Sequence, residues 1–373
     1  MNLTHQFTAV STLQLSLMGS FLIALGVQLY YYLRYFFPLS NYQSNEKQDT
    51  AEGVSIIIAA KNEAETIEQC VRKLLNQVYP HFEIIVVNDY SEDATLELLN
   101  GLKSDKLTVL NNEVGPGKKS ALSQGIEKAH YELLLFTDAD CLPNSNFWIS
   151  TMVKHFSDEK EVVLGFGAFQ KDRGVLNKLI RFEGFMTALQ YFGFARVGQA
   201  YMGVGRNLAY RKSSFKKIGG FNVHQAILSG DDDLLVNNVA TSSNVAIEMN
   251  KEAHTTTASE SSWKSFVFQK RRQLSAGAHY KKKDKLRLAI FGAANFLYYG
   301  LFVILLLFSS FTLLILGIFV TKQVLEYLVF KRIANQLGVE DLLPLILFLE
   351  PLYIFSMTAI GISTWFWRVN KWK

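Results

Sequence analysis

Two carboxylates separated by one residue follow an apolar run near the middle of the chain. Asp138-Ala139-Asp140 comes directly after Leu133-Leu134-Leu135-Phe136. Residues i and i+2 of an extended chain point to the same side, so both carboxylates can converge where the strand ends. The carboxyl ends of parallel strands are where open α/β sheets bind ligands, and paired carboxylates suit a hard divalent cation held against phosphate oxygens. Because D-x-D also arises by chance in surface loops, its interpretation depends on the surrounding sequence.

A second acidic cluster, Asp231-Asp232-Asp233, follows Gly230. Three adjacent aspartates repel one another, which tends to raise at least one pKa toward the range that suits a general base. The chain has only two cysteines, Cys70 and Cys141, and these provide neither a disulfide framework nor a metal-ligand spacing. We interpret both as buried thiols of a protein in a reducing compartment.

The sequence around the D-x-D alternates between strand and helix patterns. Strands are predicted at 54–59, 82–87, 107–110 and 133–136, and helices at 63–77 and 118–128. This regular alternation predicts a parallel sheet covered on both faces. Residues 176–194 carry apolar and aromatic residues at helical spacing. That helix could pack on the sheet or lie at a membrane surface, and the sequence leaves both open.

The composition indicates a soluble domain joined to membrane segments. The chain has 373 residues, of which 49% are hydrophobic and 19% charged. This is too apolar for a purely soluble protein and too polar for a channel. No basic and aromatic pattern recurs along the chain, so nucleic acid is not expected as a partner.

Residues 13–32 are almost uncharged and long enough to cross a bilayer. A secretory signal peptide is disfavoured, because no Lys or Arg precedes the segment and no small-residue cleavage pattern follows it. Tyr30, Tyr31 and Tyr32 form an aromatic interface anchor with Arg34. The basic residues Arg34 and Lys47 follow the span, which predicts an outside N terminus and a cytoplasmic domain.

The last third of the chain is predicted to be membrane-embedded. A basic run over 281–287 precedes the apolar segment 288–308 and is typical of a cytoplasmic juxtamembrane collar. Two further apolar segments follow at 311–330 and 342–367, the first with Lys322 and Glu326 in an interfacial-looking second half. Charge counting leaves two or three C-terminal spans open. With three spans, Arg368, Lys371 and Lys373 would lie outside; with two, Lys322, Lys331 and Arg332 would.

Glu350-Pro351 lies inside the last apolar segment. A carboxylate at membrane depth is costly and often functional. We favour a simpler interpretation, in which the helix breaks at Pro351 near the interface and Glu350 meets water or Lys322.

Several segments together resemble the family 2 glycosyltransferases of GT-A fold, in their membrane-integrated bacterial form. The similarity runs from about 54 to 272, and the segments that carry it are 55–63, 86–95, 117–122, the D-x-D, 203–210, 230–235 and 269–273. The resemblance implies a Rossmann-like mixed sheet with helices on both faces, plus transmembrane helices. We expect an N-terminal transmembrane anchor over 1–35, a linker over 36–53, a cytoplasmic catalytic domain with interfacial helices over 54–287 and a membrane region over 288–373.

The resemblance also implies roles for single residues. Those expected to contact the nucleotide-sugar are Ala60, Glu63, Asp89, Lys118, Asp138, Gln269, Arg271 and Arg272. Asp89 would hold the uracil edge, Asp138 would lie by the ribose, and Arg272 would meet the diphosphate with its fork of donors. Asp140 would reach Mg²⁺ or Mn²⁺, which neutralises the diphosphate as it departs.

The same resemblance places the sugar and acceptor pocket at Gly203, Gly205 and Asn207. Asp232 corresponds to the base, with Asp231 in place of the usual Glu, although one residue of slippage leaves Asp231 or Asp233 open. Gln273 is a departure, because processive members carry Trp at this position by the acceptor entrance.

The implied function is inverting, metal-dependent transfer of a sugar from a UDP-linked donor at the cytoplasmic face of the cell (inner) membrane. The acceptor would be lipid-linked or amphipathic, since the site would lie against membrane lipids. A processive polysaccharide synthase is the nearest alternative. An alternative of another class is a catalytically silent membrane protein that binds nucleotides or serves as a scaffold.

Overall fold

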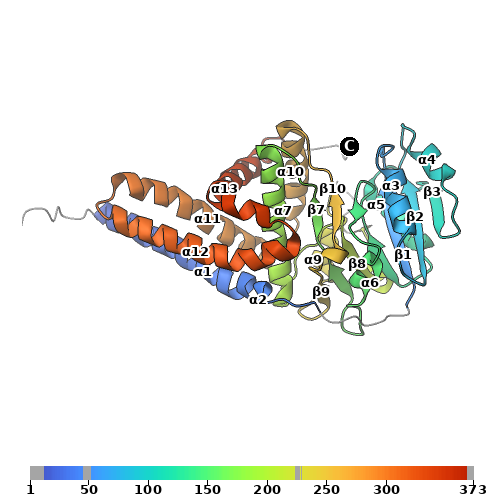
Figure 1. The fold of residues 1–373 in the computed structure, drawn as a ribbon, viewed down its shortest axis with the longest axis horizontal. Coiled ribbons are helices and arrows are strands. Elements are labelled where there is room, and N and C mark those ends of the chain that lie inside the picture. Colours follow the sequence, from blue (N-terminus) through green and yellow to red (C-terminus); the bar gives the residue numbers. More distant parts are fainter. Residues whose placement is uncertain (1–11, 45–51, 223–226, 228, 368–373) are drawn as a thin grey trace, which may run out of the picture.

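A sheet domain and a group of long helices make up the protein (Figure 1). The computed structural model describes residues 12–44, 52–222, 227 and 229–367. The predicted basic residues Lys47, Arg368, Lys371 and Lys373 lie outside the described residues.

The main sheet has seven strands in the order β3-β2-β1-β4-β8-β6-β9. Their bounds are Val54–Ala60 (β1), Phe82–Asn88 (β2), Leu107–Asn111 (β3), Leu133–Phe136 (β4), Val162–Leu164 (β6), Leu208–Arg211 (β8) and Val245–Ile247 (β9). Strands β1 to β4 pair in parallel, as the alternating pattern predicts. Strand β8 runs antiparallel to both β4 and β6, so the sheet is mixed, as the family resemblance implies.

Helices on both faces of the sheet give it two apolar cores. On β1, Ile56 and Ile58 belong to one cluster and Ile57 belongs to the other, because successive side chains of a strand point to opposite faces. The helices around the sheet are Ile67–Leu75 (α3), Thr95–Gly101 (α4), Lys118–Lys128 (α5), Trp148–Val153 (α6), Lys212–Lys217 (α8) and Asp233–Val239 (α9). The prediction for 118–128 is confirmed, whereas α3 begins later than the predicted 63–77, because the chain from Ala60 first turns through Asn62 at a positive φ of 55°.

A second, three-stranded sheet connects the D-x-D region with later parts of the chain. Its order is β5-β10-β7, with bounds Leu142–Pro143 (β5), Gly167–Phe169 (β7) and Thr255–Thr257 (β10). Strand β5 follows the D-x-D directly, so this small sheet fixes the loop that carries the two carboxylates.

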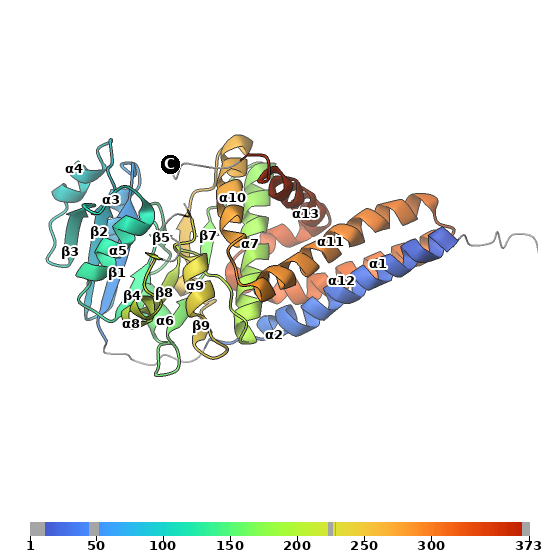
Figure 2. The same ribbon diagram turned by 180° about the vertical axis from the view of Figure 1, so that it is seen from behind.

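Helix α7 (Val175–Arg196) joins the sheet domain to the long helices. Of the two alternatives that the sequence left open, packing on the sheet is confirmed, and the same helix also packs on a long helix. Its Phe182 and Phe185 lie in one apolar cluster with Ile57 of the sheet and with Phe330 of a long helix. Helix α10 (Trp263–Gly277) lies beside α7 (Figure 2).

Among the residues that the structure describes, four helical segments are long and apolar enough to cross a membrane, namely Thr12–Ser40, Lys282–Phe308 (α11), Thr312–Leu337 (α12) and Glu340–Ser363. The first comprises Thr12–Tyr31 (α1), a π-helical turn Tyr32–Phe36 (η1) and Phe37–Ser40 (α2), and the last comprises Glu340–Leu345 (η4) and Ile346–Ser363 (α13). Helices α1, α11 and α12 extend side by side away from the sheets (Figure 1). At their far end, Gln14 Nε2 donates to the carbonyl of Phe308 at 3.0 Å.

Two basic residues of the long helices, Arg287 and Arg332, lie at the end near the sheets. Tyr31 donates its hydroxyl to the carbonyl of Arg287 at 2.7 Å, and Arg332 Nη1 donates to Asn41 Oδ1 at 2.8 Å. Helix α12 therefore returns Arg332 to the side of the sheet domain.

Charged side chains are buried together among the long helices. Lys322 Nζ lies 2.6 Å from Glu326 Oε2 and 3.1 Å from Glu350 Oε2, and each of the three residues is at most 1% exposed. Tyr32 donates its hydroxyl to Glu326 at 2.9 Å, and Tyr299 donates to Glu350. Buried charges are tolerated when they are paired and hydrogen-bonded, as these are.

This cluster corrects two expectations from the sequence. Lys322 and Glu326 do not face outward from α12, because they are buried and paired inside the helix group. Helix α13 does not break at Pro351 but continues from Ile346 to Ser363. The expected contact of Glu350 with Lys322 is confirmed.

We predict that Lys322→Met strongly destabilises the protein. It would leave two buried carboxylates without their cation, a change that costs about 3–5 kcal/mol. Thermal unfolding of the purified protein in detergent measures this as a lower melting temperature. Lys331→Met, at an exposed position of the same helix, is the matched control and should melt like the wild type. Equal melting temperatures for both variants would contradict the role of the cluster.

Candidate active site

The loops after the parallel strands converge on one cavity of about 490 Å³. Glu63 follows β1, and Asp138 and Asp140 follow β4, so all three lie at the carboxyl edge of the sheet, where open α/β folds bind ligands. We call this the DxD cavity. Other predicted site residues that line it are Lys118, Gly205, Asp231, Asp232, Gln269 and Arg272.

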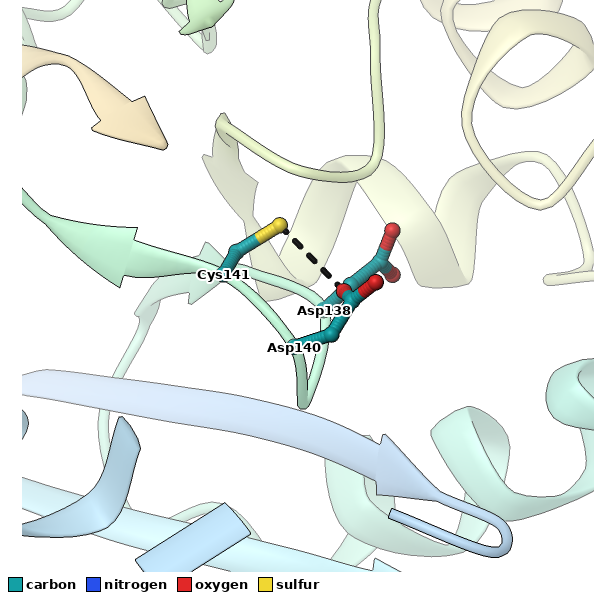
Figure 3. A group of neighbouring side chains, drawn as sticks. All are labelled: Asp138, Asp140 and Cys141. Atoms are coloured by element: carbon teal, nitrogen blue, oxygen red, sulfur yellow. Dashed lines mark hydrogen bonds between the residues drawn. The ribbon is translucent and has the colours of Figure 1, made fainter. Parts of the chain in front are cut away.

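Asp138, Asp140 and Cys141 form a compact group (Figure 3), and its two aspartates line this cavity. One ligand atom from each lies within 4.8 Å of the others. Asp140 accepts a hydrogen bond from the Thr257 hydroxyl at 3.1 Å, and the Cys141 thiol donates to Asp140 Oδ1 at 3.5 Å. Burial, reinforced by the charges of Asp140 and Asp138, raises the pKa of the Cys141 thiol well above its usual value. The protonated thiol is a poor ligand, but the two carboxylates fit a hard divalent cation.

Lys118 connects the two acidic motifs. Its Nζ lies 2.8 Å from Asp138 Oδ1 and 2.8 Å from Asp231 Oδ2. Burial opposes the charge on Lys118, but Asp138 and Asp231 outweigh it and hold the pKa of Lys118 well above its usual value. Burial likewise opposes ionisation of Asp138, yet Lys118 keeps the pKa of Asp138 below its usual range. Both partners are therefore charged at neutral pH.

Asp89 positions Lys118 from outside the DxD cavity. It is fully buried, and its carboxylate accepts hydrogen bonds from the backbone N–H of Gly117 at 3.0 Å and from Asn112 Nδ2 at 2.7 Å. Gly117 has a φ of 134°, which glycine adopts readily, and Lys118 is the first residue of α5. In this structure Asp89 does not line the DxD cavity but fixes the turn that aims Lys118.

The glycine-rich segment is held in a similar way. Asn207 is fully buried; its Oδ1 accepts from Trp148 Nε1 at 3.1 Å, and its Nδ2 donates to the carbonyls of Phe166 and Ala253. These contacts hold the preceding segment, including Gly205, beside Asp232. Gly203 packs against the core and Ala60 is buried at the end of β1, so these predicted residues shape the site from outside the cavity.

Asp232 is positioned by the backbone at the start of α9. Its Oδ2 accepts from the N–H of Gly205 at 2.6 Å, and its Oδ1 accepts from the N–H of Asp233 at 2.7 Å. Burial, together with the charge on Asp231, raises the pKa of Asp232 to about 6. Burial and the charge on Asp232 raise the pKa of Asp233 to about 7, although Tyr280 donates its hydroxyl to Asp233 at 2.6 Å.

A second cavity of about 420 Å³ lies between the acidic cluster and the long helices. We call it the helix-side cavity. Its walls include Glu183 of α7, Lys270 of α10, Leu288 of α11 and Tyr353 and Met357 of α13. Glu183 and Lys270 form a buried ion pair at 2.6 Å.

The two cavities meet at Asp232. Among the residues that define the cavities, Asp232 lines both, whereas Asp231 lines only the DxD cavity and Asp233 only the helix-side cavity. Asp231 is paired with Lys118, and Asp233 with Tyr280. The geometry thus favours Asp232 as the base among the three aspartates that the sequence left open. A carboxylate there can deprotonate a hydroxyl in one cavity as it attacks a group held in the other.

The two neighbouring arginines of α10 point in different directions. Arg272 lines the DxD cavity, as predicted, but Arg271 donates from Nε to Ser363 Oγ of α13 at 2.8 Å and does not line the cavity. The prediction that Arg271 contacts the donor is not supported by this geometry, because successive residues of a helix are rotated by about 100°.

Arg206 is a cavity residue that the sequence did not identify. It lines both cavities, and its guanidinium lies over the ring of Phe169 at 4.1 Å. Its Nη1 is buried and has no hydrogen-bond partner in the described part of the chain, and the same holds for Oε1 of Gln269 beside it in the DxD cavity. In the sequence, only the position of Arg206 next to Gly205 pointed to the site, because a single arginine forms no recognisable motif.

Known proteins resemble part of this chain. Residues 55–219 match the family described as "Glycosyl transferase family 2". A poly-beta-1,6-N-acetyl-D-glucosamine synthase of Staphylococcus epidermidis is 27% identical over 201 residues, which cover 51% of this chain and 45% of that protein. The enzyme of the same name from Staphylococcus aureus is 30% identical over 156 residues, which cover 40% and 38% of the two chains. The chain thus matches less than half the length of these relatives.

A solved structure shows the same fold. The mannosyltransferase from Pyrobaculum calidifontis, in complex with GDP-Man and Mn²⁺, superposes with a TM-score of 0.61 at 16% identity, over 94% of this chain and 99% of that one. The mixed sheet covered by helices is therefore a GT-A fold.

Proposed function

We propose that this chain, which carries a family 2 glycosyltransferase domain, transfers a sugar from a nucleotide-sugar to an acceptor hydroxyl with Asp232 as the general base. The observation that carries the proposal is the position of Asp232 at the junction of the two cavities. The donor occupies the DxD cavity, and the acceptor occupies the helix-side cavity. Cavities of this size suit ligands of a few hundred Å³.

In the proposed reaction Asp232 accepts the proton of the acceptor hydroxyl while its oxygen attacks the anomeric carbon. The bond from that carbon to the diphosphate oxygen breaks on the opposite side, so the configuration inverts. The N–H groups of Gly205 and Asp233 hold the carboxylate in place for this step. Lys118 and Arg272 lie where the negative charge of the departing diphosphate develops, and fixed cations there stabilise the transition state.

We further propose that Asp140 binds Mg²⁺ or Mn²⁺, with Asp138 beside it at the same strand end. Two carboxylates at a strand end, within reach of one another, match the oxygen ligands that these ions prefer. A bound ion would add positive charge beside the diphosphate. The Pyrobaculum mannosyltransferase, which shares the fold, is bound to Mn²⁺.

The proposed donor is a UDP-linked sugar. The names of the staphylococcal relatives support N-acetylglucosamine as its sugar. The Pyrobaculum neighbour binds GDP-Man, so GDP-mannose is the donor against which UDP-N-acetylglucosamine should be tested first.

We place the sheet domain on the cytoplasmic side of the inner membrane. Arg34, the run over 281–287 and Arg332 all lie at the end of the long helices near the sheets, and cytoplasmic loops carry an excess of Lys and Arg. The helix-side cavity is bounded by α11 and α13, which supports an acceptor that is lipid-linked or amphipathic.

Processive polysaccharide synthesis is a second candidate, because the staphylococcal relatives are named as synthases of a polymer. Gln273 lines both cavities where processive members of the family carry Trp, and it accepts a hydrogen bond from Lys270 at 2.8 Å. The loss of a stacking surface favours single transfer. The length of the reaction product distinguishes the two.

We predict that Asp232→Asn lowers the rate of sugar transfer about 10²–10⁴-fold, the usual contribution of a general base, without abolishing nucleotide binding. Nucleoside diphosphate release and product formation, measured beside calorimetric titration of UDP, test both parts. Asp105→Asn, in an exposed loop, is the matched control. Full activity of Asp232→Asn would exclude it as the base.

The pH dependence of kcat/KM should fall on the acid side near pH 6. The base must be ionised, and burial raises the pKa of Asp232 to about 6, so activity is lost as the pH drops through that value. With a base of ordinary aspartate pKa, the enzyme would lose activity only near pH 4. Asp231→Asn removes the neighbouring negative charge and should move this loss of activity to lower pH. If the loss stays at the same pH, the titrating group is not Asp232.

We predict that Asp140→Ala weakens Mn²⁺ binding by more than about tenfold, since even residues that only support metal ligands contribute that much. Electron paramagnetic resonance of free Mn²⁺ measures the affinity without any need for turnover. Cys141→Ala is the control and should retain the affinity, because its protonated thiol is not a ligand. Equal losses in both variants would contradict the assignment.

A further inference from the structure

The side chain of Arg206 is held against strand β7. Its guanidinium carbon lies 4.1 Å from the centre of the Phe169 ring. A Cβ at Gly167 would come within 2.9 Å of Arg206 Cβ and 3.2 Å of its Nε, so the glycine leaves the room that this side chain occupies. Positions 167 and 169 belong to the same face of the strand. The Thr255 hydroxyl donates to the carbonyl of Arg206 at 2.8 Å, which fixes the backbone as well.

Arg206 lies beside the proposed base. The residue before it, Gly205, donates its N–H to Asp232 Oδ2 at 2.6 Å. Arg206 and Asp232 both line the DxD cavity and the helix-side cavity. In the proposed reaction the anomeric carbon of the donor lies at this junction, because a hydroxyl deprotonated by Asp232 must reach it. The substituent on the neighbouring carbon, C2 of the sugar, therefore lies in the region that Arg206 lines.

One donor and one acceptor atom in the DxD cavity are buried without partners. Within the part of the chain that the structure describes, Arg206 Nη1 has no hydrogen-bond acceptor and Gln269 Oε1 has no hydrogen-bond donor. Unpaired buried polar atoms are costly, and a ligand that pairs with them removes the cost. The best ligand for this pair of atoms presents both an acceptor and a donor.

A secondary amide presents these two functions on separate atoms. Its carbonyl oxygen accepts, its N–H donates, and the two bonds point in opposite directions in the trans form. Arg206 precedes β8 and Gln269 lies on α10, so the two unpaired atoms also belong to different elements. A hydroxyl would have to serve both through a single oxygen. Val204, which lines both cavities, provides an apolar contact for the methyl group of an acetamido substituent.

We propose that Arg206 and Gln269 select the donor by binding a 2-acetamido group on the sugar that is transferred. The carbonyl oxygen of this group accepts from Arg206 Nη1, and its N–H donates to Gln269 Oε1. The assignment rests on the proposed function and adds to it the two residues that distinguish an N-acetylated sugar from one with a hydroxyl at C2.

A comparison of two donors measures this selection. Release of UDP gives kcat/KM for UDP-N-acetylglucosamine and for UDP-glucose, which differ only at C2. The wild type should favour the first by at least about a hundredfold, because UDP-glucose lacks the amide that pairs with both atoms.

Two variants test the two residues separately. Arg206→Met should reduce the preference for the N-acetylated donor at least about tenfold, because it removes a hydrogen bond from a charged group. Gln269→Leu should reduce it about threefold or more, and it tests the proposal even if Arg206→Met does not fold. Arg173→Met, at an exposed position, is the matched control for the loss of an arginine and should keep the preference.

Binding of UDP alone distinguishes recognition of the sugar from recognition of the diphosphate. UDP has no sugar to transfer, so calorimetric titration should give wild-type affinity, within about twofold, for Arg206→Met. A loss of UDP affinity of about tenfold or more would assign Arg206 to the diphosphate and overturn the proposal.

The other outcomes separate this inference from the proposed function. Equal losses of kcat/KM with both donors would indicate a structural role for Arg206 and Gln269 and overturn the inference. A wild type that prefers UDP-glucose or GDP-mannose would also overturn it, while sugar transfer itself would stand.

Absence of nucleotide release from every nucleotide-sugar would instead refute the proposed function. Titration of the two UDP-sugars into the wild type and Arg206→Met would then still decide the selection. Tighter binding of UDP-N-acetylglucosamine that is lost in the variant supports the two residues as its determinants, and equal affinities in both proteins contradict them.

Discussion

The ion pairs of Lys118 with Asp138 and Asp231 are the interaction on which the site depends. Carboxylates gathered at one edge of a sheet repel one another, and burial makes that repulsion stronger. A cation between the two acidic motifs lets Asp138 stay ionised, while Asp232, which Lys118 does not contact directly, has a raised pKa. Asp138 thus remains negatively charged, whereas the higher pKa of Asp232 suits proton transfer.

Much of the sheet half of the protein could be predicted from local patterns. Strands β1 to β4 and helix α5 follow from continuous apolar runs and helical spacing, and the D-x-D lies at the strand end that its spacing indicates. The direction of each side chain on α10 could not be predicted. Arg272 lines the cavity, whereas Arg271, the preceding residue of the same helix, is rotated away from it and contacts Ser363 of α13. The choice among Asp231, Asp232 and Asp233 likewise needed the positions of two cavities formed by distant segments.

The long helices show where sequence patterns mislead. Lys322, Glu326 and Glu350 look too polar for the membrane when each is considered on its own helix. In the structure they neutralise one another across α12 and α13, which no pattern within one helix reveals. In the same way, the contacts of the η4–α13 segment with Arg181 and Arg271 depend on the positions of α7 and α10, which its apolar length does not reveal.

Helix α10 presents Arg272 to one cavity and attaches, through Arg271, to the helix above the other. Because a helix moves as a rigid unit, a tilt of α10 displaces both arginines together. A shift of α10 would therefore change the DxD cavity and the helix-side cavity at the same time.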